Sequence, residues 1–296
     1  MLSGNERVSE LQGRLASAGY IAERSLSATL LLFTELQRPL LLEGDAGVGK
    51  TEIARILSEI FDCPLIRLQC YEGLDVNAAV YEWNYQHQLL AIKLLEQGKV
   101  SPENAEQQIF SERYLLQRPL LQAITQPRSP VLLIDEIDRA DEEFEAFLLE
   151  LLSDFQVSVP EIGTIRAVSR PYVILTSNGT RELSDALRRR CLYHYVEYPE
   201  FDKELRILNA RVPEIGPQLA RQVVAFVQEL RKFDLRKKPG IAETLDWAAA
   251  LLRLDVNSLD CEPQVIMDSL VCLLKTREDS VGLSQFEVER LMAKAV

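Results

Sequence analysis

The sequence predicts an α/β domain over residues 1–200, followed by a smaller all-α domain over residues 201–296. Between about residues 39 and 198, short apolar runs bounded by chain breakers alternate with helical patterns, as in a parallel sheet covered by helices on both faces. From about residue 202 onward only helical patterns occur. A length of 296 residues is enough for one or two such domains.

Composition excludes several classes of protein. The chain is 47% hydrophobic, which is ordinary for a globular protein and excludes a disordered or fibrous one. Its net charge of −12 argues against non-specific binding to nucleic acid or to anionic membranes, which requires a surplus of Lys and Arg. Five widely spaced cysteines indicate a reducing compartment, and two distant histidines do not suggest a metal site. Without a signal peptide or a membrane-spanning run, a soluble cytoplasmic protein is expected.

Five apolar runs predict the strands of the sheet. Four of them begin at a proline, and the fifth ends shortly before Pro199. Runs of four to six apolar residues bounded by breakers are typical of buried parallel strands. The predicted strands cover residues 39–42, 64–68, 130–134, 171–176 and 193–196.

A helix is predicted over residues 139–155, with a β-hairpin directly after it over 155–168. Apolar residues at 144, 147, 148, 151 and 152 share one helical face, and Asp141 supplies an N-terminal cap. Two alternating arms around a turn at 160–163 predict the hairpin. Because the turn has few apolar residues, we expect its tip to project instead of packing in the core.

The all-α domain is predicted from helical spacing and prolines. Apolar residues between Leu245 and Leu252 recur every three or four positions. Pro213, Pro239 and Pro263 are the expected breaks between helices.

A phosphate-binding loop lies between the first strand and a helical run at 52–61. The segment matches G-x-x-x-x-G-K-[ST] and comprises Gly44, Asp45, Ala46, Gly47, Val48, Gly49, Lys50 and Thr51. Its glycines let successive backbone N–H groups face the phosphates, and the helix N-terminus adds partial positive charge. Lys50 is expected to neutralise the phosphates and the Thr51 hydroxyl to bind Mg²⁺, so ATP with Mg²⁺ is the expected cofactor.

Two carboxylates follow the strand at 130–134. Nucleotide hydrolysis needs one carboxylate for the magnesium shell and a second to polarise the attacking water. Asp135 suits the first role, as a metal ligand together with Thr51, and Glu136 suits the second. An acidic cluster alone is usually a solvated loop, but its place after a complete phosphate loop favours the catalytic interpretation.

Two further polar positions suit a nucleotide site. Asn178 follows the fourth strand, where an amide can bond the γ-phosphate and the lytic water. Taken alone, a turn-forming Asn before Gly179 is the better explanation. The run at 188–190 precedes the last strand. An arginine there is either part of a solvated face or is donated to the γ-phosphate of a neighbouring subunit.

In this order, the loop, the Asp-Glu pair, the strand-end Asn, the arginines and the α-helical second domain resemble the AAA+ ATPases over essentially the whole chain. The hairpin and the loop sequence at 41–51 look like the MoxR group. Segments 69–75, 79–85, 144–154 and 183–191 resemble MoxR-type ATPases associated with maturation of molybdenum hydroxylases such as aerobic carbon monoxide dehydrogenase.

The resemblance implies a P-loop core whose five parallel strands have the order 5-1-4-3-2, followed by a helical lid. It also implies a homo-oligomeric, hexameric ring with ATP between subunits, and a partner with a von Willebrand factor A domain. Residue by residue, it assigns Lys50 and Thr51 to phosphate and magnesium, Asp135 and Glu136 to the metal and the water, and Asn178 to the first sensor. Arg190 matches the arginine finger, with Arg189 as the alternative.

The lid departs from the superfamily pattern. Many AAA+ lids place an arginine near the start of a lid helix to contact the γ-phosphate, whereas Glu243 occupies the comparable stretch here. Either a cation among 236–238 replaces it, namely Arg236, Lys237 or Lys238, or the lid responds to nucleotide without a cation.

A helical insert is expected over about residues 71–110. Four aromatic residues concentrate near its start: Tyr71, Tyr81, Trp83 and Tyr85. They could grip a client or partner protein, but packing of the insert is the favoured interpretation.

The leading functional hypothesis is an ATP-driven machine that remodels a client metalloenzyme for metal-cofactor insertion or activation. The alternative is a DNA-directed AAA+ motor or loader, which the net charge of −12 disfavours. A small-molecule kinase would waste ATP through a water-activating Glu136. A scaffold that binds ATP without turnover is excluded only by assay.

Overall fold

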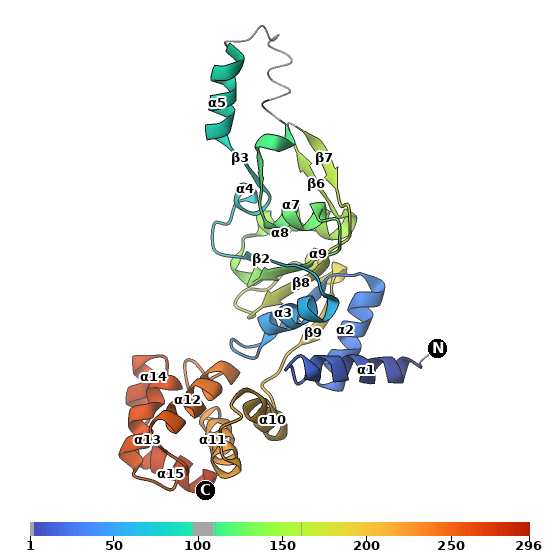
Figure 1. Ribbon diagram of the computed structural model, residues 1–296. Coiled ribbons are helices and arrows are strands. Elements are labelled where there is room, and N and C mark those ends of the chain that lie inside the picture. The colour runs from blue at the N-terminus through green and yellow to red at the C-terminus, as the bar shows by residue number, and fades with distance from the viewer. Residues whose placement is uncertain (1–2, 97–108, 110, 161) are drawn as a thin grey trace. The chain divides into compact units, whose positions relative to one another are not determined.

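The computed structural model describes residues 3–96, 109, 111–160 and 162–296, and Figure 1 names its elements. The chain forms two compact units. The first unit comprises Met1–Leu11, Arg24–Glu43 and Thr51–Tyr195. The second comprises Gln12–Glu23, Gly44–Lys50 and Val196–Val296. The phosphate loop therefore groups with the C-terminal helices in this division.

A five-stranded parallel sheet forms the centre of the first unit (Figure 1). Its strand order is β2-β5-β8-β1-β9. Numbered one to five along the chain, these strands read 5-1-4-3-2 from the β9 edge, the order that the resemblance implies. The bounds are β1 Leu40–Glu43, β2 Leu65–Gln69, β5 Val131–Asp135, β8 Tyr172–Ser177 and β9 Leu192–Tyr195.

Burial explains why the apolar runs form strands. Every residue of β5 is buried, and β8 and β1 are buried at all but one position each, because helices cover both faces of the central strands. The edge strand β2 instead alternates exposed and buried residues. This alternation places two polar side chains of β2, Arg67 and Gln69, on the same face of the strand.

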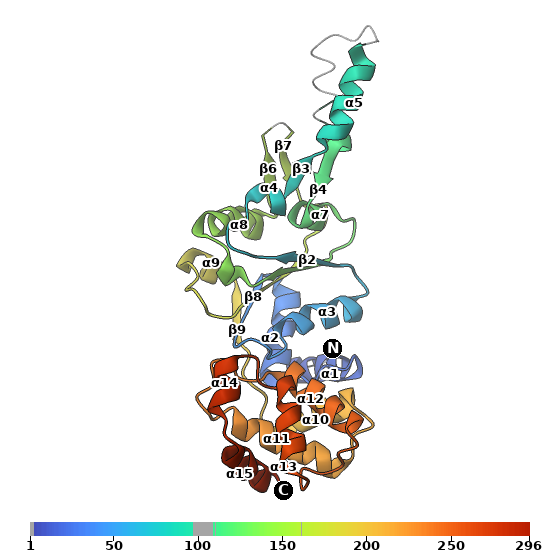
Figure 2. The ribbon, with the colours of Figure 1, turned by 90° about the vertical axis from the view of Figure 1, so that its left-hand side faces the viewer.

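Helices cover the two faces of the sheet. Figures 1 and 2 show α7 and α8 on one face and α2 and α3 on the other. The structure confirms the helix predicted after the third strand and its cap, since the Asp141 carboxylate accepts a hydrogen bond from the Phe144 N–H at 2.9 Å. Outside residues 71–118, the helices before residue 196 are α1 Gly4–Ser17, α2 Arg24–Leu36, α3 Lys50–Phe61, α7 Pro119–Thr125, η2 Ile137–Arg139, α8 Glu142–Asp154 and α9 Asp185–Arg190.

The predicted helical insert is partly wrong. Residues 81–83 form a strand, β3, which pairs antiparallel with β4. Trp83 is buried there, whereas Tyr71 and Tyr85 are exposed, so packing accounts for only some of the aromatic residues. The expected insert also includes residues 97–108 and 110, which lie outside the described residues. Its described elements are α4 Val76–Ala79, β3 Tyr81–Trp83, α5 Tyr85–Glu96, η1 Glu112–Tyr114 and β4 Leu115–Gln117.

The predicted hairpin is present as β6 Gln156–Val159 and β7 Gly163–Arg166. Val157 and Val159 are buried, because one face of the hairpin packs on the hydrophobic core. The expectation that the turn projects instead of packing in the core is wrong for Ile162, because this residue is partly buried against the core. Figures 1 and 2 show the hairpin and the β3–β4 ribbon at the same end of the first unit.

The second unit is helical beyond residue 196. Pro213 lies between two helices, Pro239 precedes a third and Pro263 begins a fourth, as predicted. The Trp247 and Phe226 rings, 4.8 Å apart between centroids, lie in a core of their own. The helices, drawn together in Figure 2, are α10 Phe201–Arg211, α11 Pro217–Leu230, α12 Ile241–Arg253, α13 Pro263–Ser269, η3 Leu270–Cys272, α14 Arg277–Gly282 and α15 Gln285–Ala295.

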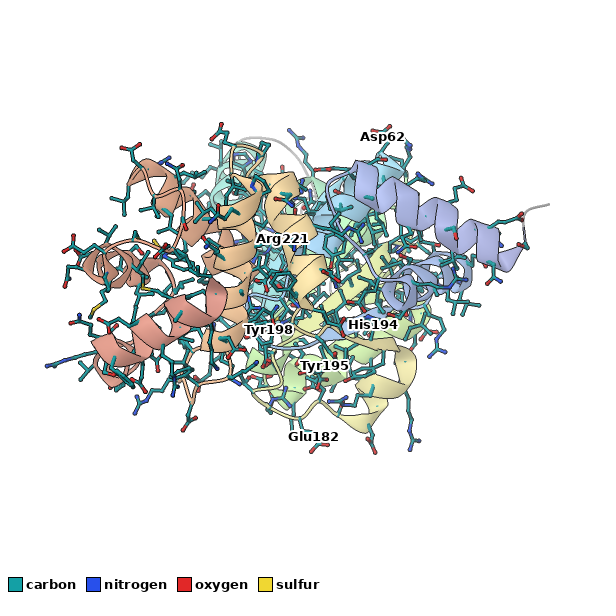
Figure 3. The ribbon with its side chains drawn as sticks, turned by 90° about the horizontal axis from the view of Figure 1, so that it is seen from below. Asp62, Glu182, His194, Tyr195, Tyr198 and Arg221 are labelled. Carbon is teal, nitrogen blue, oxygen red and sulfur yellow. The ribbon has the colours of Figure 1, made fainter. Side chains whose placement is uncertain are left out.

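A buried ion pair organises this helical unit. The Arg231 guanidinium donates two hydrogen bonds to the Glu204 carboxylate, both at 2.6 Å, and one to the Pro239 carbonyl at 2.8 Å. It also lies 4.9 Å from the ring centre of Tyr198, which Figure 3 labels. Because these partners satisfy both buried charges, the pair fixes the turn before α12.

In the ranges that the structure describes, no helix combines the length and apolar character needed to cross a membrane.

Candidate functional site

Asp135 ends β5 as a buried carboxylate whose two oxygens both have partners. Its Oδ1 accepts hydrogen bonds from the hydroxyls of Thr51, at 3.1 Å, and Thr176, at 2.5 Å. Its Oδ2 forms an ion pair with Arg67 from the neighbouring strand β2. The structure therefore brings together Thr51 and Asp135, the two predicted metal ligands.

Glu136 follows in a left-handed backbone conformation, with φ 56° and ψ 50°. Its N–H donates to the Thr176 hydroxyl at 2.9 Å. Its Oε2 accepts from the Gln69 amide at 3.0 Å and from Arg139 at 3.1 Å. Residues other than glycine rarely adopt this conformation, so the surrounding hydrogen bonds must stabilise the turn. The turn directs the Glu136 side chain away from that of Asp135.

Asp138 ties the end of β8 to the loop after β5. Its Oδ2 accepts hydrogen bonds from the Asn178 N–H at 3.2 Å and from the Thr180 hydroxyl at 2.6 Å. Burial by itself raises the pKa of Asp138, but the hydrogen bonds from Thr180 and Asn178 outweigh it and hold the pKa below its usual value. The backbone of Asn178, the predicted sensor, is therefore anchored by an ionised carboxylate.

The two candidate finger arginines differ in their contacts. Arg190 donates to the Ser153 hydroxyl at 2.6 Å and to the Ala186 carbonyl at 3.0 Å. The Arg189 side chain is exposed and makes no hydrogen bond or ion pair with any residue that the structure describes. Arg188 instead pairs with Glu43 at the end of β1. Arg190 and Arg189 thus both remain candidates for a site outside their own subunit.

The loop from Gly44 to Lys50 wraps around the lysine ammonium. Lys50 Nζ donates to the carbonyl oxygens of Gly44 and Asp45, both at 2.7 Å. Lys50 is also the first residue of α3, so the loop ends at a helix N-terminus as predicted. A buried ammonium at a helix N-terminus provides positive charge for binding a phosphate.

The start of α12 contacts this loop within the second unit. The Ile241 N–H donates to the Gly47 carbonyl at 3.0 Å. A Cβ on Gly240 would lie 2.7 Å from the Gly47 Cα, so the approach requires glycine. Glu243 accepts from the Gly240 N–H at 2.9 Å and caps its own helix.

No cation occupies the lid position that Glu243 fills. The side chains of Arg236, Lys237 and Lys238 are exposed, and Arg236 pairs with Glu278 at 3.5 Å. The hydrogen bond between α12 and the loop joins backbone atoms. That Arg236, Lys237 or Lys238 responds to nucleotide, or that the lid does so without a cation, stays a prediction.

The two side chains assigned to the metal, Thr51 and Asp135, both offer oxygen atoms, although Arg67 also pairs with Asp135 Oδ2. A hydroxyl and a carboxylate 3.1 Å apart, those of Thr51 and Asp135, suit Mg²⁺, which usually takes one or two protein oxygens together with phosphates and waters. In the part of the chain that the structure describes, no group of three or more His, Cys, Asp or Glu could hold a metal ion by itself. The residues present therefore fit Mg²⁺ bound with a nucleotide.

Sequence reasoning missed Arg67, Gln69, Thr176 and Asp138. The pairing of β2 with β5 brings Arg67 and Gln69 to the Asp-Glu pair, and the pairing of β5 with β8 brings Thr176 there. Asp138 lies in η2, directly after the pair. Polar residues near the end of an otherwise apolar strand were a usable signal for Thr176. Arg67 and Gln69 required the strand order as well.

A parallel sheet carrying a phosphate loop after β1 and a carboxylate pair after β5 defines a P-loop nucleotide-binding protein. Residues 39–191 match the family model described as AAA domain (dynein-related subfamily), over just over half of the chain. The chain belongs to this family, and it is an ATPase. AAA+ domains commonly form oligomeric rings.

The sequence similarity to curated relatives extends beyond the residues that match the family model. Uncharacterised proteins of Staphylococcus aureus strains USA300, bovine RF122 / ET3-1 and NCTC 8325 / PS 47 are each 28% identical over 227 residues. The matched region covers 74% of this chain and 78% of each relative. The similarity therefore includes part of the sequence outside 39–191.

Proposed function

We propose that the chain is a MoxR-type AAA+ ATPase that remodels a client protein, with metal-cofactor insertion or activation of a metalloenzyme as the outcome. The family match supports the ATPase, and the sequence resemblance to MoxR-type proteins supports the finer class. The proposed setting is a soluble protein of the cytoplasm, in a hexameric ring with a von Willebrand factor A domain partner.

The proposed nucleotide site uses the loop and the end of β5. The loop residues 44–50 bind the ATP phosphates through backbone N–H groups and the Lys50 ammonium. Thr51 and Asp135 hold Mg²⁺, which when bound neutralises charge that develops on the phosphates. This assignment is supported by the 3.1 Å hydrogen bond between the Thr51 hydroxyl and the Asp135 carboxylate.

Glu136 is proposed to accept a proton from the attacking water, and Asn178 to orient that water and report the nucleotide state. Glu136 suits its role because its carboxylate is one third exposed and accepts hydrogen bonds at one oxygen only in the described residues. Arg190, or alternatively Arg189, completes the site of a neighbouring subunit.

The remodelling role is supported by two antiparallel ribbons, β3–β4 and β6–β7, which form one end of the first unit. Neither ribbon belongs to the five-stranded sheet that holds the ATPase residues (Figures 1 and 2). The hairpin packs one face on the core, so its other face, including Arg166, remains exposed. We infer that this face engages the client.

A charge reversal on the hairpin tests this role. The variant Arg166→Glu and the control Arg221→Glu, on α11 in the second unit (Figure 3), are each co-expressed with aerobic carbon monoxide dehydrogenase as the client. Both arginines are exposed, so both variants should fold and retain ATPase activity. Arg166→Glu should lose client activation and Arg221→Glu should retain it. Full activation by Arg166→Glu would exclude the hairpin face.

A further inference from the structure

The positively charged side chain of Arg67, on β2, contacts Asp135, the carboxylate on β5 that is proposed to bind the metal. Its guanidinium pairs with Asp135 Oδ2 and donates to the Gln69 side-chain oxygen at 2.6 Å. The side-chain amide of Gln69 in turn donates a hydrogen bond to Glu136, which fixes the orientation of Gln69. Arg67 is thus oriented by a second side chain of its own strand.

The two ends of this ion pair are unequally exposed. The Asp135 side chain is 5% exposed, so its negative charge needs partners, whereas the Arg67 side chain is 53% exposed and can move into solvent. The same carboxylate is the one that the proposed ATPase site assigns to Mg²⁺. A guanidinium and a divalent cation repel each other when both lie beside one carboxylate.

We propose that Arg67 is a positioning residue that competes with nucleotide-bound Mg²⁺ for Asp135. In the nucleotide-free protein Arg67 satisfies Oδ2 and keeps the carboxylate in place. When a magnesium nucleotide binds, Arg67 yields that oxygen and swings outward, so part of the binding free energy is used to break the ion pair. This inference rests on the proposed function, because it requires the metal to bind at Asp135.

Competition can be distinguished from direct phosphate binding. If Arg67 bound a phosphate, its removal would weaken ATP binding whether or not metal is present. If Arg67 competes with the metal, its removal strengthens binding of the magnesium nucleotide and leaves metal-free binding nearly unchanged. The ratio of the ATP affinity with Mg²⁺ to the ATP affinity without metal therefore measures the competition between Arg67 and the metal.

The experiment measures equilibrium binding of a fluorescent ATP analogue to the full chain, with Mg²⁺ and with EDTA. Arg67→Met removes the charge at an exposed position, and Arg67→Lys keeps it. Arg118→Met is the matched control, since Arg118 is similarly exposed and pairs with Glu82 on the β3–β4 ribbon.

Arg67→Met should raise the ratio of metal-dependent to metal-free affinity roughly fivefold, as expected for loss of a partly exposed ion pair. Arg67→Lys and Arg118→Met should keep the wild-type ratio. An unchanged or lower ratio in Arg67→Met, or weaker binding in both conditions, would overturn the proposal. Failure of the wild-type protein to bind the analogue would instead contradict the proposed nucleotide site.

Discussion

Thr176 is the residue that links the two acidic side chains of the site. It is 1% exposed, and its hydroxyl donates to Asp135 while accepting from the backbone N–H of Glu136. One hydroxyl thereby satisfies a buried carboxylate oxygen and holds the left-handed turn at Glu136. Buried polar groups that lose such a partner are costly, because water does not replace it.

We expect Thr176→Val to lower the free energy of unfolding by about 1–3 kcal/mol, since it leaves the Glu136 N–H and one Asp135 contact unsatisfied. Urea denaturation measures the change. Thr176→Ser keeps the hydroxyl and is the control, expected to lose less. Equal stability of Thr176→Val and the wild-type protein would show that the hydroxyl does not hold this turn.

At the residue scale, the sequence predicted the groups that a motif defines. Thr51 and Asp135 were assigned together because a phosphate loop demands a magnesium carboxylate, and the structure joins them. Arg67 and Thr176 were not predicted, because the expected strand order says which strands are neighbours but not which of their residues lie beside Asp135. That register is seen only in the structure.

The helix α8 shows how local chemistry fixes an element. Asp141 accepts from the Phe144 N–H, and three glutamates lie in the first turn, where the helix dipole favours negative charge. Phe144, Leu148 and Leu151 on one face are buried against the sheet. The cap therefore sets the residue at which the helix begins, and the apolar face sets which side of the helix packs against the sheet.

Asp141→Ala should destabilise the protein by about 1 kcal/mol, because the Phe144 N–H loses its acceptor. Thermal unfolding followed by circular dichroism measures the shift in Tm. Asp141→Asn retains a capping oxygen and should lie close to the wild-type Tm. If alanine and asparagine had the same effect, the negative charge and not the cap would stabilise this end.

Elements differ in how well the sequence predicted them. The five strands and the β6–β7 hairpin were predictable, because apolar runs and adjacent alternating arms are local signals. The β3–β4 ribbon was not, because its two strands have three residues each and lie far apart in sequence. Its pairing is decided by the tertiary structure.

For the whole molecule, the contacts of the arginines on α9 bear on the expected ring. Arg188 is tied to Glu43 within the first unit, whereas Arg190 contacts only neutral groups in the described part of the chain. A guanidinium held by a hydroxyl and a carbonyl exchanges these partners for a phosphate at lower cost than one paired with a carboxylate. This comparison disfavours Arg188, and it leaves Arg190 as the proposed finger with Arg189 as the alternative.

Arg190→Ala should bind ATP nearly as the wild-type protein does, with turnover reduced by about 10³- to 10⁵-fold, the value of an arginine finger. Mixing it with Lys50→Ala subunits should restore part of the ATPase activity, because some interfaces then combine an intact loop with an intact finger. A dead mixture of assembled subunits would mean that Arg190 acts in its own subunit or only in structure, and not as a finger. The same pair of measurements on Arg189→Ala decides between the two arginines.

Parallel measurement of ATP binding and ATP turnover in two variants tests the proposed site most directly. Lys50→Ala should abolish binding of a fluorescent ATP analogue, because the loop loses its only lysine cation. Glu136→Gln should bind the analogue with wild-type affinity and hydrolyse ATP at less than about a hundredth of the wild-type rate. Hydrolysis by Glu136→Gln at the wild-type rate would contradict the account.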